Sequence, residues 1–424
     1  MKLFELDAEI VRGLVASVRG VEDDDGAPES EATAEAFARL AWTVLIEPAD
    51  QVAGQVIAGL GARRALESVI ADDPGPAVAL LLADGVARRR AEQVAGDAFA
   101  RWRPRVAARP VVRSIEYAAE LGLRAALPGD PAWPEGFALL GPAAPVALWL
   151  RGDPARLPAL AGSVAIVGAR AATGYGEHVA TELAGGIAER DVPVVSGGAY
   201  GIDAAAHRSA LAADGLTAAF LAGGLDRYYP AGNADLLSRV GDTGLLIAEV
   251  PPGVPPTRVR FLTRNRLLAA VSDATVVVEA GLRSGSLNTA HHAFTIGRPV
   301  GVVPGPVTSA MSAGCHRLLR EQDAVCVTSV DEVLQLAGGA PPDDETPRTA
   351  ADPDVIRVLD ALGPRRARTP DEIARSSGMA VAAVLGVLGA LEVADVVERR
   401  ETGWVRAVAD RSRAPSTAGG GAIA

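Results

Sequence analysis

The sequence predicts a protein of the α/β class, built around a parallel β-sheet with crossover helices. Six short apolar runs carry this prediction, and each breaks at a glycine before a helix-length amphipathic segment: Val164–Val167, Val194–Ser196, Thr217–Leu221, Leu245–Ala248, Thr275–Glu279 and Val300–Val303. Strands that are buried on both faces form continuous apolar runs instead of alternating patterns. Ligands of such sheets bind at the carboxyl ends of the strands. The unusual residues of this chain collect at those ends.

Length and charge narrow the possible classes of protein. A chain of 424 residues is expected to form two or three domains. The net charge of −11 argues against non-specific coating by nucleic acid, although it leaves room for a local basic site. Lys2 is the only lysine, so phosphate contacts elsewhere must come from arginine, whose planar fork offers several donors.

Cysteine usage and the N-terminus favour a soluble, cytoplasmic protein. Cys315 and Cys326 are too few for a disulfide scaffold or a zinc site. The first residues carry acids where a signal peptide needs an apolar core, and no later run approaches the length of a membrane span. We therefore expect no membrane partner.

Composition divides the chain into successive segments. Two arginine clusters in the helical part, Arg88–Arg90 and Arg101 to Arg105, favour a solvated helix face, with auxiliary DNA contact as the alternative. The expected segments are an acidic leader (1–33), a helical domain (34–125), a proline-rich connector (126–160), the sheet domain (161–340), a linker (341–352), a small C-terminal domain (353–408) and a disordered tail (409–424).

The first strand leads into a glycine-rich loop. Gly168 and Arg170 follow the strand directly, and backbone amides at such a turn can approach an anion at a helix N-terminus. A dinucleotide-binding loop would have a small residue where Arg170 stands. The second strand also lacks an acid at the ribose-binding position, because it ends in Ser196-Gly197-Gly198. We therefore expect no nicotinamide cofactor.

The second and third loops leave alternatives open. Asp203 and His207 share a helix face, which allows an acid–base pair, although a local hydrogen bond that orders the helix start is the favoured interpretation. Tyr228 and Tyr229 could stack on a base or cover the edge of the sheet.

The segment after the fourth strand predicts contact with a single-stranded nucleic acid. Guanidinium groups suit phosphates, and an aromatic ring suits an unstacked base. The alternative to nucleic-acid contact is a run of charged residues on the protein surface that binds no ligand. The segment places four arginines around one aromatic residue and one amide: Arg258, Arg260, Arg264 and Arg266 around Phe261 and Asn265.

The loop after the fifth strand offers another anion site but no catalytic pattern. Ser284, Gly285 and Ser286 open a helix with amides and hydroxyls. Glu279 at the strand tip could bind a metal, but no second carboxylate stands near it. No Ser–His–Asp order or metal-ligand spacing is present. The sequence thus predicts neither a cofactor nor catalysis.

Six collinear motifs resemble the DNA-processing protein A family, also called DprA or Smf. They span the central domain: VGAR (Val167–Arg170), SGGAYGIDAAAH (Ser196–His207), AGGLDRYYPAGN (Ala222–Asn233), FLTRNRLLAAVS (Phe261–Ser272), VVEAGLRSGSLNTA (Val277–Ala290) and VPGPVTSAMSAGCHRLL (Val303–Leu319). The resemblance implies an extended Rossmann-like domain that binds single-stranded DNA and helps load the RecA recombinase in natural transformation. It also implies homodimers, for which the region Leu318–Val327 is the expected contact.

The resemblance also implies roles for single residues. Arg170 would bind phosphate, while Phe261, Arg264, Asn265 and Arg266 would form the basic, aromatic part of the DNA pocket. Ser196, Gly197, Gly198, Ser284, Gly285 and Ser286 would line anion nests beside Gly168. Family members often have pocket lysines, and Arg208, Arg258 or Arg260 is expected to replace them here.

The C-terminal residues predict a winged-helix domain, as the family often carries. Helices are expected at Asp354–Leu362, after a capping box at Thr369–Glu372, and at Ala380–Glu392, followed by a hairpin near Thr402. The third helix has no basic or amide side chain, so reading of base edges is not expected. Arg399, Arg400 and Arg406 could touch phosphates, and a protein contact is the favoured alternative.

A related glycine-rich group that hydrolyses nucleotide monophosphates provides the alternative function. Those enzymes need a PGGxGT-type loop with an Arg–Glu pair, whereas this chain reads EAGLRSGSLNT. The departure favours a binding protein. A nucleotide-sensing regulator is disfavoured by the uncharged third helix.

Overall fold

The computed structural model describes residues 3–20, 31–339, 353–362, 367–394, 396–400 and 402–406. The chain forms two compact units, residues 1–339 and 340–424, which are described one at a time. The acidic run at 21–30, the expected linker at 341–352 and the expected tail at 409–424 lie outside the described residues. The finer division of the first unit into domains stays a prediction.

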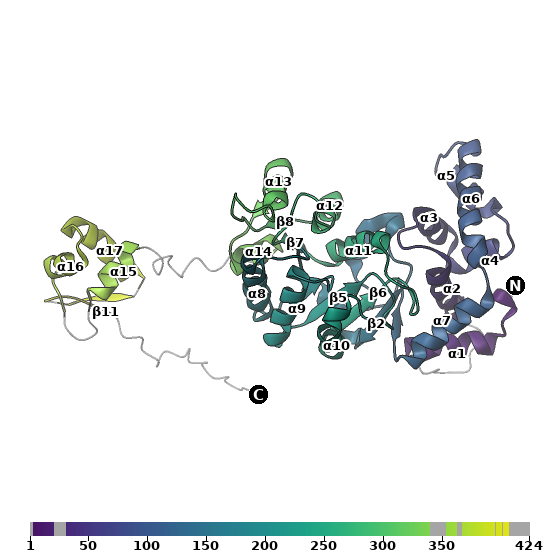
Figure 1. The fold of residues 1–424 in the computed structure, drawn as a ribbon, viewed down its shortest axis with the longest axis horizontal. Coiled ribbons are helices and arrows are strands. Elements are labelled where there is room, and N and C mark those ends of the chain that lie inside the picture. Colours follow the sequence, from purple (N-terminus) through teal and green to yellow (C-terminus); the bar gives the residue numbers. More distant parts are fainter. Residues whose placement is uncertain are drawn as a thin grey trace, which may run out of the picture. The chain divides into compact units, whose positions relative to one another are not determined.

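A nine-stranded sheet forms the centre of the first unit (Figure 1). Its order is β1-β2-β6-β5-β4-β3-β7-β8-β9, with parallel pairing from β6 to β9. The parallel strands are β3 (Val164–Val167), β4 (Val194–Ser196), β5 (Thr217–Leu221), β6 (Leu245–Ala248), β7 (Ala274–Val277), β8 (Val300–Val302) and β9 (Val325–Cys326). The α/β class and the six expected strands are confirmed.

Two antiparallel strands were not expected: the first ends where the expected proline-rich connector (126–160) begins, and the second lies inside it. β1 (Arg124–Ala126) pairs with β2 (Leu148–Gly152), and β2 pairs with β6. No strand was predicted in either place, because three and five residues beside prolines give too short a pattern to recognise. β9 was also missed, and it has only two residues.

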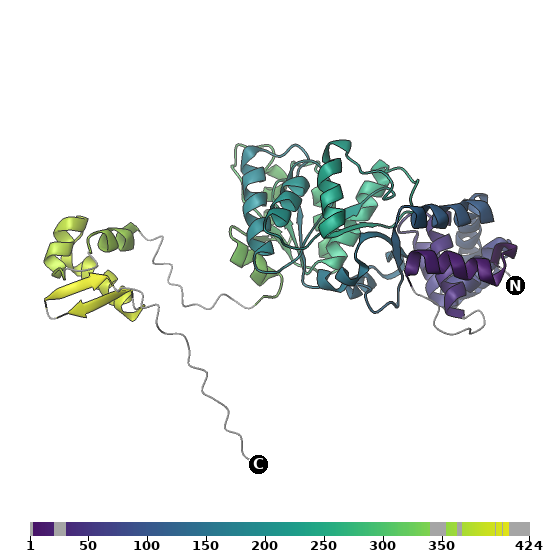
Figure 2. The same cartoon turned by 90° about the horizontal axis from the view of Figure 1, so that it is seen from below.

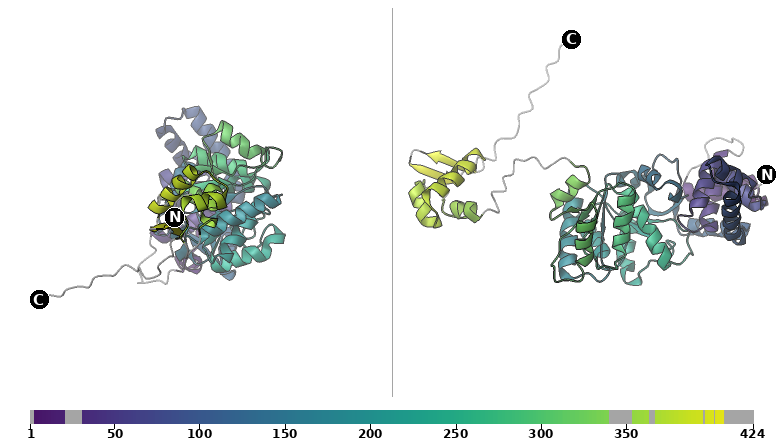
Figure 3. Two further views of the ribbon diagram at one scale, coloured as in Figure 1. Left: turned by 90° about the vertical axis from the view of Figure 1, so that its left-hand side faces the viewer. Right: turned by 90° about the horizontal axis from the view of Figure 1, so that it is seen from above.

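Helices cover both faces of the sheet, as a doubly wound fold requires. Successive residues of β3 point to opposite cores: Ala165 and Val167 pack into one, Val164 and Ile166 into the other. The first core also contains α11 (Arg258–Val271), α12 (Ser286–Thr295) and α13 (Ala313–Glu321). The opposite face carries α8 (Gly174–Ala188), α9 (Ile202–Ala212), α10 (Ala234–Thr243) and α14 (Val330–Leu336). Figure 1 shows the strands between these two layers, and Figure 3 gives further views of the same unit.

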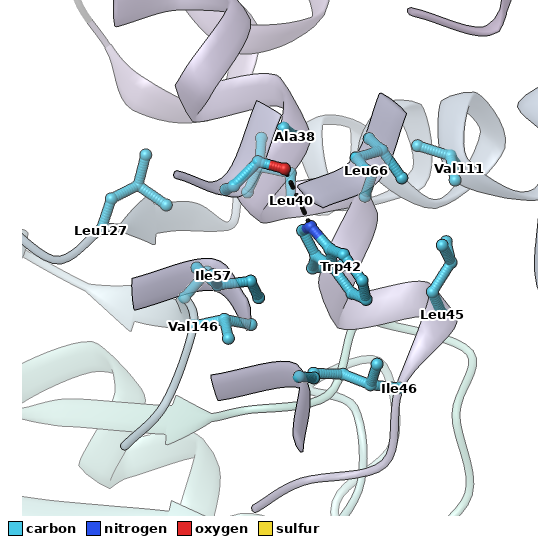
Figure 4. Close-up of a cluster of buried hydrophobic side chains, with 14 of the residues drawn as sticks. Ala38, Leu40, Trp42, Leu45, Ile46, Ile57, Leu66, Val111, Leu127 and Val146 are labelled. Carbon is cyan, nitrogen blue, oxygen red and sulfur yellow. Dashed lines mark hydrogen bonds between the residues drawn. The ribbon is translucent and has the colours of Figure 1, made fainter. Parts of the chain in front are cut away.

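The N-terminal region is helical, as expected, and packs beside the antiparallel end of the sheet (Figure 2). Trp149 of β2 joins the same core as the N-terminal helices, so the sheet and the helical region share one continuous interior. Trp42 lies at its centre, where the indole Nε1 donates to Ala62 O at 3.0 Å (Figure 4). The helices are α1 (Ala8–Arg19), α2 (Glu31–Leu45), α3 (Gln51–Leu60), α4 (Ala62–Ile70), α5 (Gly75–Ala83), α6 (Arg88–Trp102) and α7 (Ala108–Glu120).

Short 3-10 turns link these elements. They lie at Leu3–Glu5 (η1), Arg103–Arg105 (η2), Glu135–Ala143 (η3), Pro154–Arg156 (η4), Pro158–Leu160 (η5) and Ala231–Asn233 (η6). The Arg101–Arg105 cluster ends α6 and forms η2, and its arginines pair with acids of the helical region: Asp50, Asp72 and Glu47. This pairing favours the interpretation of that cluster as a solvated helix face over auxiliary DNA contact.

The second unit contains the expected three helices and hairpin. They are α15 (Pro353–Asp360), α16 (Pro370–Ser377), α17 (Val381–Val393), β10 (Val397–Arg400) and β11 (Gly403–Arg406). The predicted capping box is present, since Thr369 and Glu372 exchange side-chain hydrogen bonds with each other's backbone amides. Val384, Leu388 and Leu391 of α17 pack into the core of this unit, whereas Val381, Leu385 and Val393 are exposed.

No single helix in the described residues is long and apolar enough to cross a membrane. The bent pair α16–α17 meets that criterion by length and composition only.

Candidate nucleic-acid interface

A cavity of about 760 Å³ lies at the carboxyl ends of β3 and β7. The chain runs from β3 outward through β4, β5 and β6, and then returns to place β7 on the other side of β3. This is the point where a doubly wound sheet reverses its strand order, and ligands of such folds bind there. Many of the residues that the sequence singled out line the cavity: Gly168, Arg170, Arg258, Phe261, Arg264, Asn265, Ser284, Gly285 and Ser286.

Backbone contacts hold the first loop in place. Ala169 N donates to Glu279 O at 2.8 Å, and Ala169 O accepts from Ile202 N at 3.3 Å. Gly201 has a φ of +73°, and a Cβ at this position would overlap the carbonyl groups of Ala169 and Arg170. A glycine is therefore required where the second loop crosses the first.

Both carboxylate oxygens of Glu279 are engaged at the start of α8. Its Oε2 accepts from Thr173 N at 2.9 Å, and its Oε1 accepts from Thr173 Oγ1 at 2.7 Å. The residue is buried and does not line the cavity. Among the described residues, no three His, Cys, Asp or Glu side chains lie close enough together to hold a metal ion.

The first turns of α11 form one wall of the cavity. Thr257 caps the helix, because its hydroxyl accepts from Arg260 N at 3.3 Å. Arg258, Phe261 and Asn265 lie three and four residues apart and share the face toward the cavity. Asn265 Nδ2 donates to Gly285 O at 3.3 Å and to Asn288 Oδ1 at 3.2 Å. The amide thus fixes α11 against the N-terminus of α12.

Arg264 is a buried cation at the floor of the cavity. Its guanidinium donates to Phe220 O, and Gly197 leaves the room for it, since a Cβ there would overlap the guanidinium. Burial lowers the pKa of Arg264 to about 10, with the charge of Asp203 partly opposing this and that of Arg170 adding to it. Arg170 is exposed beside this buried cation, and the positive charge of both groups favours an anion in the cavity.

Asp203 and His207 do not pair with each other. His207 Nδ1 lies 2.8 Å from Thr217 Oγ1, which itself donates to Val194 O, so the imidazole is the donor. Asp203 Oδ2 accepts from Ala199 N at 3.4 Å, which supports the loop-ordering interpretation. Burial, with the charge of Arg264, lowers the pKa of His207 to about 3, and burial raises the pKa of Asp203.

The sequence did not single out Arg283, and it left the role of Tyr229 open, yet both line the cavity. Arg283 lies in the quoted EAGLRSGSLNT motif, which was the available signal for it, and its side chain is exposed. Tyr229 is 51% exposed, and its ring centroid lies 5.6 Å from that of Phe261. Tyr228 instead packs against the N-terminal core, which favours the covering role for that residue, and stacking of Tyr229 on a base stays a prediction.

Three of the expected DNA-binding arginines lie outside the cavity. Arg208 is exposed on α9. Arg260 pairs with Glu47 at 2.9 Å. Arg266 is buried, and it makes two hydrogen bonds to the Glu249 carboxylate at 2.6 and 2.8 Å. The donors of Arg260 and Arg266 are therefore engaged by protein acceptors.

Most of the second expected anion nest also lies outside the cavity. The hydroxyl of Ser196 is buried and donates to Ile166 O at 2.6 Å. The carbonyl of Gly198 accepts from Asn233 Nδ2 at 3.0 Å. Gly197 does not line the cavity itself, but it leaves room for the guanidinium of Arg264, which does. The assignment of these three residues to DNA binding stays a prediction.

The architecture and the cavity define a Rossmann-type protein with a cationic ligand site at the switch point of its sheet. Residues 124–338 match the family model of DNA recombination-mediator protein A, and residues 340–403 match the DprA winged helix domain. The chain belongs to the DprA/Smf family of DNA-processing proteins. The resemblance expected from the six motifs is thereby confirmed, as is the winged-helix class of the second unit.

Known relatives agree with this assignment. The chain is 51% identical over 324 residues to a putative DNA processing protein DprA of Mycobacterium tuberculosis, covering 72% of this chain and 82% of that protein. It is 39% identical over 193 residues to DprA of Streptococcus pneumoniae, covering 45% and 66%. The X-ray structure of the Streptococcus pneumoniae protein aligns with a TM-score of 0.57 at 29% identity, over 71% of this chain and 97% of that one.

Proposed function

We propose that this protein binds single-stranded DNA in the cavity without catalysis and loads the RecA recombinase onto it during recombination or natural transformation. The observation that carries the proposal is a set of exposed guanidiniums beside two aromatic rings, the half-buried Phe261 and the exposed Tyr229, in an acidic protein. Arg170, Arg258 and Arg283 line the cavity and have no ion-pair partner within the described part of the chain. Such a surface suits the phosphates and unstacked bases of a single strand.

Arg258 is the arginine that we propose to stand in for the family's pocket lysine. The sequence left Arg208, Arg258 and Arg260 as candidates. Of these three, Arg258 alone lines the cavity and is exposed there, whereas Arg260 is engaged by Glu47.

The engagement of Glu279 supports a non-catalytic role. Ribosyl hydrolysis in the related group needs an Arg–Glu pair with a PGGxGT-type loop. The corresponding stretch of this chain, EAGLRSGSLNT, contains one glutamate, Glu279, and one arginine, Arg283. Both carboxylate oxygens of Glu279 accept hydrogen bonds from Thr173 instead. A carboxylate held in this way orders a helix start and does not face a substrate.

The proposed homodimer would use the edge of the sheet. β9 pairs with β8 alone, and both of its residues, Val325 and Cys326, are exposed. Exposed edge strands pair readily with another chain. This favours the region Leu318–Val327 as the contact between two copies in the cytoplasm.

A titration of labelled single-stranded and duplex oligonucleotides at two salt concentrations tests the binding proposal. We expect a preference for the single strand and a log–log salt slope of roughly −0.7 for each phosphate neutralised. Arg239→Ala is the matched control, because Arg239 is exposed on α10 outside the cavity. Equal affinity for duplex DNA, or equal losses for Arg170→Ala and Arg239→Ala, would contradict the proposed site. Stimulation of RecA filament growth on coated single strands, with the DNA recovered intact, tests loading and the absence of catalysis.

A further inference from the structure

A carboxylate of the helical region reaches the start of α11. Glu47 lies in the loop between α2 and α3, and its two oxygens accept from Arg260 Nε and Nη2, each at 2.9 Å. Arg105 Nη2 donates to the same carboxylate at 3.0 Å. A bidentate contact between a guanidinium and a carboxylate fixes the geometry of both groups and is stronger than a single hydrogen bond.

Arg260 connects three segments of the chain. Besides its contact with Glu47, its Nη1 donates to Pro255 O at 2.7 Å, and its own backbone amide is capped by Thr257. The side chain of Arg260 is only 15% exposed. One guanidinium therefore joins the helical region, the loop before α11 and the first turn of α11.

The residues next to Arg260 form one wall of the cavity that we propose to bind DNA. Pro256, Thr257, Arg258 and Phe261 all line the cavity and lie within four positions of Arg260. Each helical residue advances about 100° around the axis, so Arg260 is roughly 200° away from Arg258. Arg260 thus points away from the cavity when Arg258 points into it, and its contribution is to hold the wall and not to contact phosphate.

We propose that Glu47 is a positioning residue of the single-stranded DNA site, which acts by holding Arg260 and thereby the first turn of α11. The inference rests on the proposed function of the cavity. It gives the helical region a role in binding although Glu47 itself does not line the cavity.

Simple electrostatics predicts the opposite effect of removing Glu47. Loss of a negative charge near the site, and release of Arg260 to a phosphate, would tighten DNA binding and steepen the salt dependence. A positioning role predicts weaker binding with an unchanged salt slope, because the number of phosphate contacts stays the same. The direction of the change in DNA affinity therefore distinguishes the electrostatic effect from the positioning role.

The experiment compares full-length wild type with Glu47→Gln, Arg260→Gln, the double variant and Asp72→Asn. Asp72 is the matched control, since it pairs with Arg103 at 2.7 Å in the same helical region and does not touch α11. Its φ of +54° is a conformation that asparagine tolerates. The readouts are affinity for a single-stranded oligonucleotide, its salt slope, thermal stability and amide hydrogen exchange over residues 258–262.

We expect Glu47→Gln to weaken binding about threefold to tenfold, in the range of coupled network residues. The salt slope should equal that of the wild type, and the double variant should bind no more weakly than Arg260→Gln. Exchange over residues 258–262 should speed up in Glu47→Gln and not in Asp72→Asn. Arg260→Lys keeps the charge but loses the bidentate contact, so its affinity and salt slope should resemble those of Glu47→Gln. It replaces Glu47→Gln in the comparison if that variant is poorly folded.

Binding by Glu47→Gln that equals or exceeds that of the wild type, or a loss equal to that of Asp72→Asn, would overturn the positioning role. A wild type that binds no single-stranded DNA would instead defeat the proposed function. The hydrogen-exchange comparison still decides in that case whether Glu47 holds α11.

Discussion

The guanidinium carbon of Arg170 lies 4.8 Å from the centroid of the Phe261 ring. The two residues come from the loop after β3 and from α11, and both line the cavity. A cation over an aromatic face is a favourable contact that competes with base stacking for the same face. Transfer of Arg170 from the ring to a phosphate would expose the ring to a base, which links the two kinds of contact.

Substitution of these two residues should separate phosphate binding from stacking. Arg170→Ala is expected to reduce the magnitude of the salt slope by roughly 0.7, because one phosphate contact is lost. Phe261→Leu should cost about 1–3 kcal/mol of binding free energy, the range for a stacked base, and leave the salt slope unchanged. Anisotropy titrations at several salt concentrations measure both. A slope change in Phe261→Leu alone would contradict these roles.

Tyr229 should provide a second stacking surface. It is the more exposed of the two rings in the cavity, so Tyr229→Ala should weaken binding by about 1–3 kcal/mol, while Tyr229→Phe keeps the affinity. Tyr200→Ala is the control, since Tyr200 is 46% exposed on a neighbouring loop outside the cavity. Quenching of a fluorescent base analogue reports stacking directly. Equal quenching by wild type and Tyr229→Ala would argue against it.

Arg266 should matter for stability and not for DNA contact. Its side chain is 3% exposed and that of Glu249 is 10% exposed, so Arg266→Met leaves a buried carboxylate without its partner. The expected loss is about 3–5 kcal/mol of unfolding free energy. Urea denaturation measures it, and Arg266→Met combined with Glu249→Leu should recover part of the loss. Normal stability with reduced affinity would instead return Arg266 to the DNA site.

We expect the buried guanidinium of Arg264 to require a glycine at position 197. A methyl group at this position would displace a buried side chain that donates to Phe220 O. We expect Gly197→Ala to cost about 1–3 kcal/mol of stability, as overpacking does, and to weaken DNA binding. Gly174→Ala is the control, because the space around Gly174 is open. Thermal melts and titrations of both variants test this, and equal behaviour would contradict it.

His207 should make the fold less stable in acid. Burial, with the charge of Arg264, lowers its pKa from 6.5 to about 3, so between these values the unfolded chain binds a proton that the folded chain does not. Stability therefore falls as the pH drops through this window. His207→Asn, which can keep the donor to Thr217, should show a flatter profile between pH 7 and pH 4. Parallel profiles for wild type and variant in urea titrations would contradict the assignment.

The central strands and the binding loops could be predicted because their signals are local. A parallel strand buried on both faces leaves an unbroken apolar run, as in Val164–Val167, and a glycine marks each turn toward the ligand edge. The short antiparallel strand Leu148–Gly152 gave no such signal, because it is defined by its pairing with β6 nearly a hundred positions away.

The sequence by itself determined the family, the parallel sheet and the edge of that sheet where ligands bind. It also determined the composition of the α11 segment, with its four arginines around Phe261. These features follow from residue type and short-range spacing alone.

Only the tertiary structure decided which of those arginines face the cavity. Neighbouring helical residues point in different directions, so Arg258 reaches the cavity while Arg260 and Arg266 turn elsewhere. Their partners, Glu47 and Glu249, come from distant parts of the chain. A charge at the surface is available to a phosphate only where folding brings no carboxylate to it, and no local pattern records that outcome.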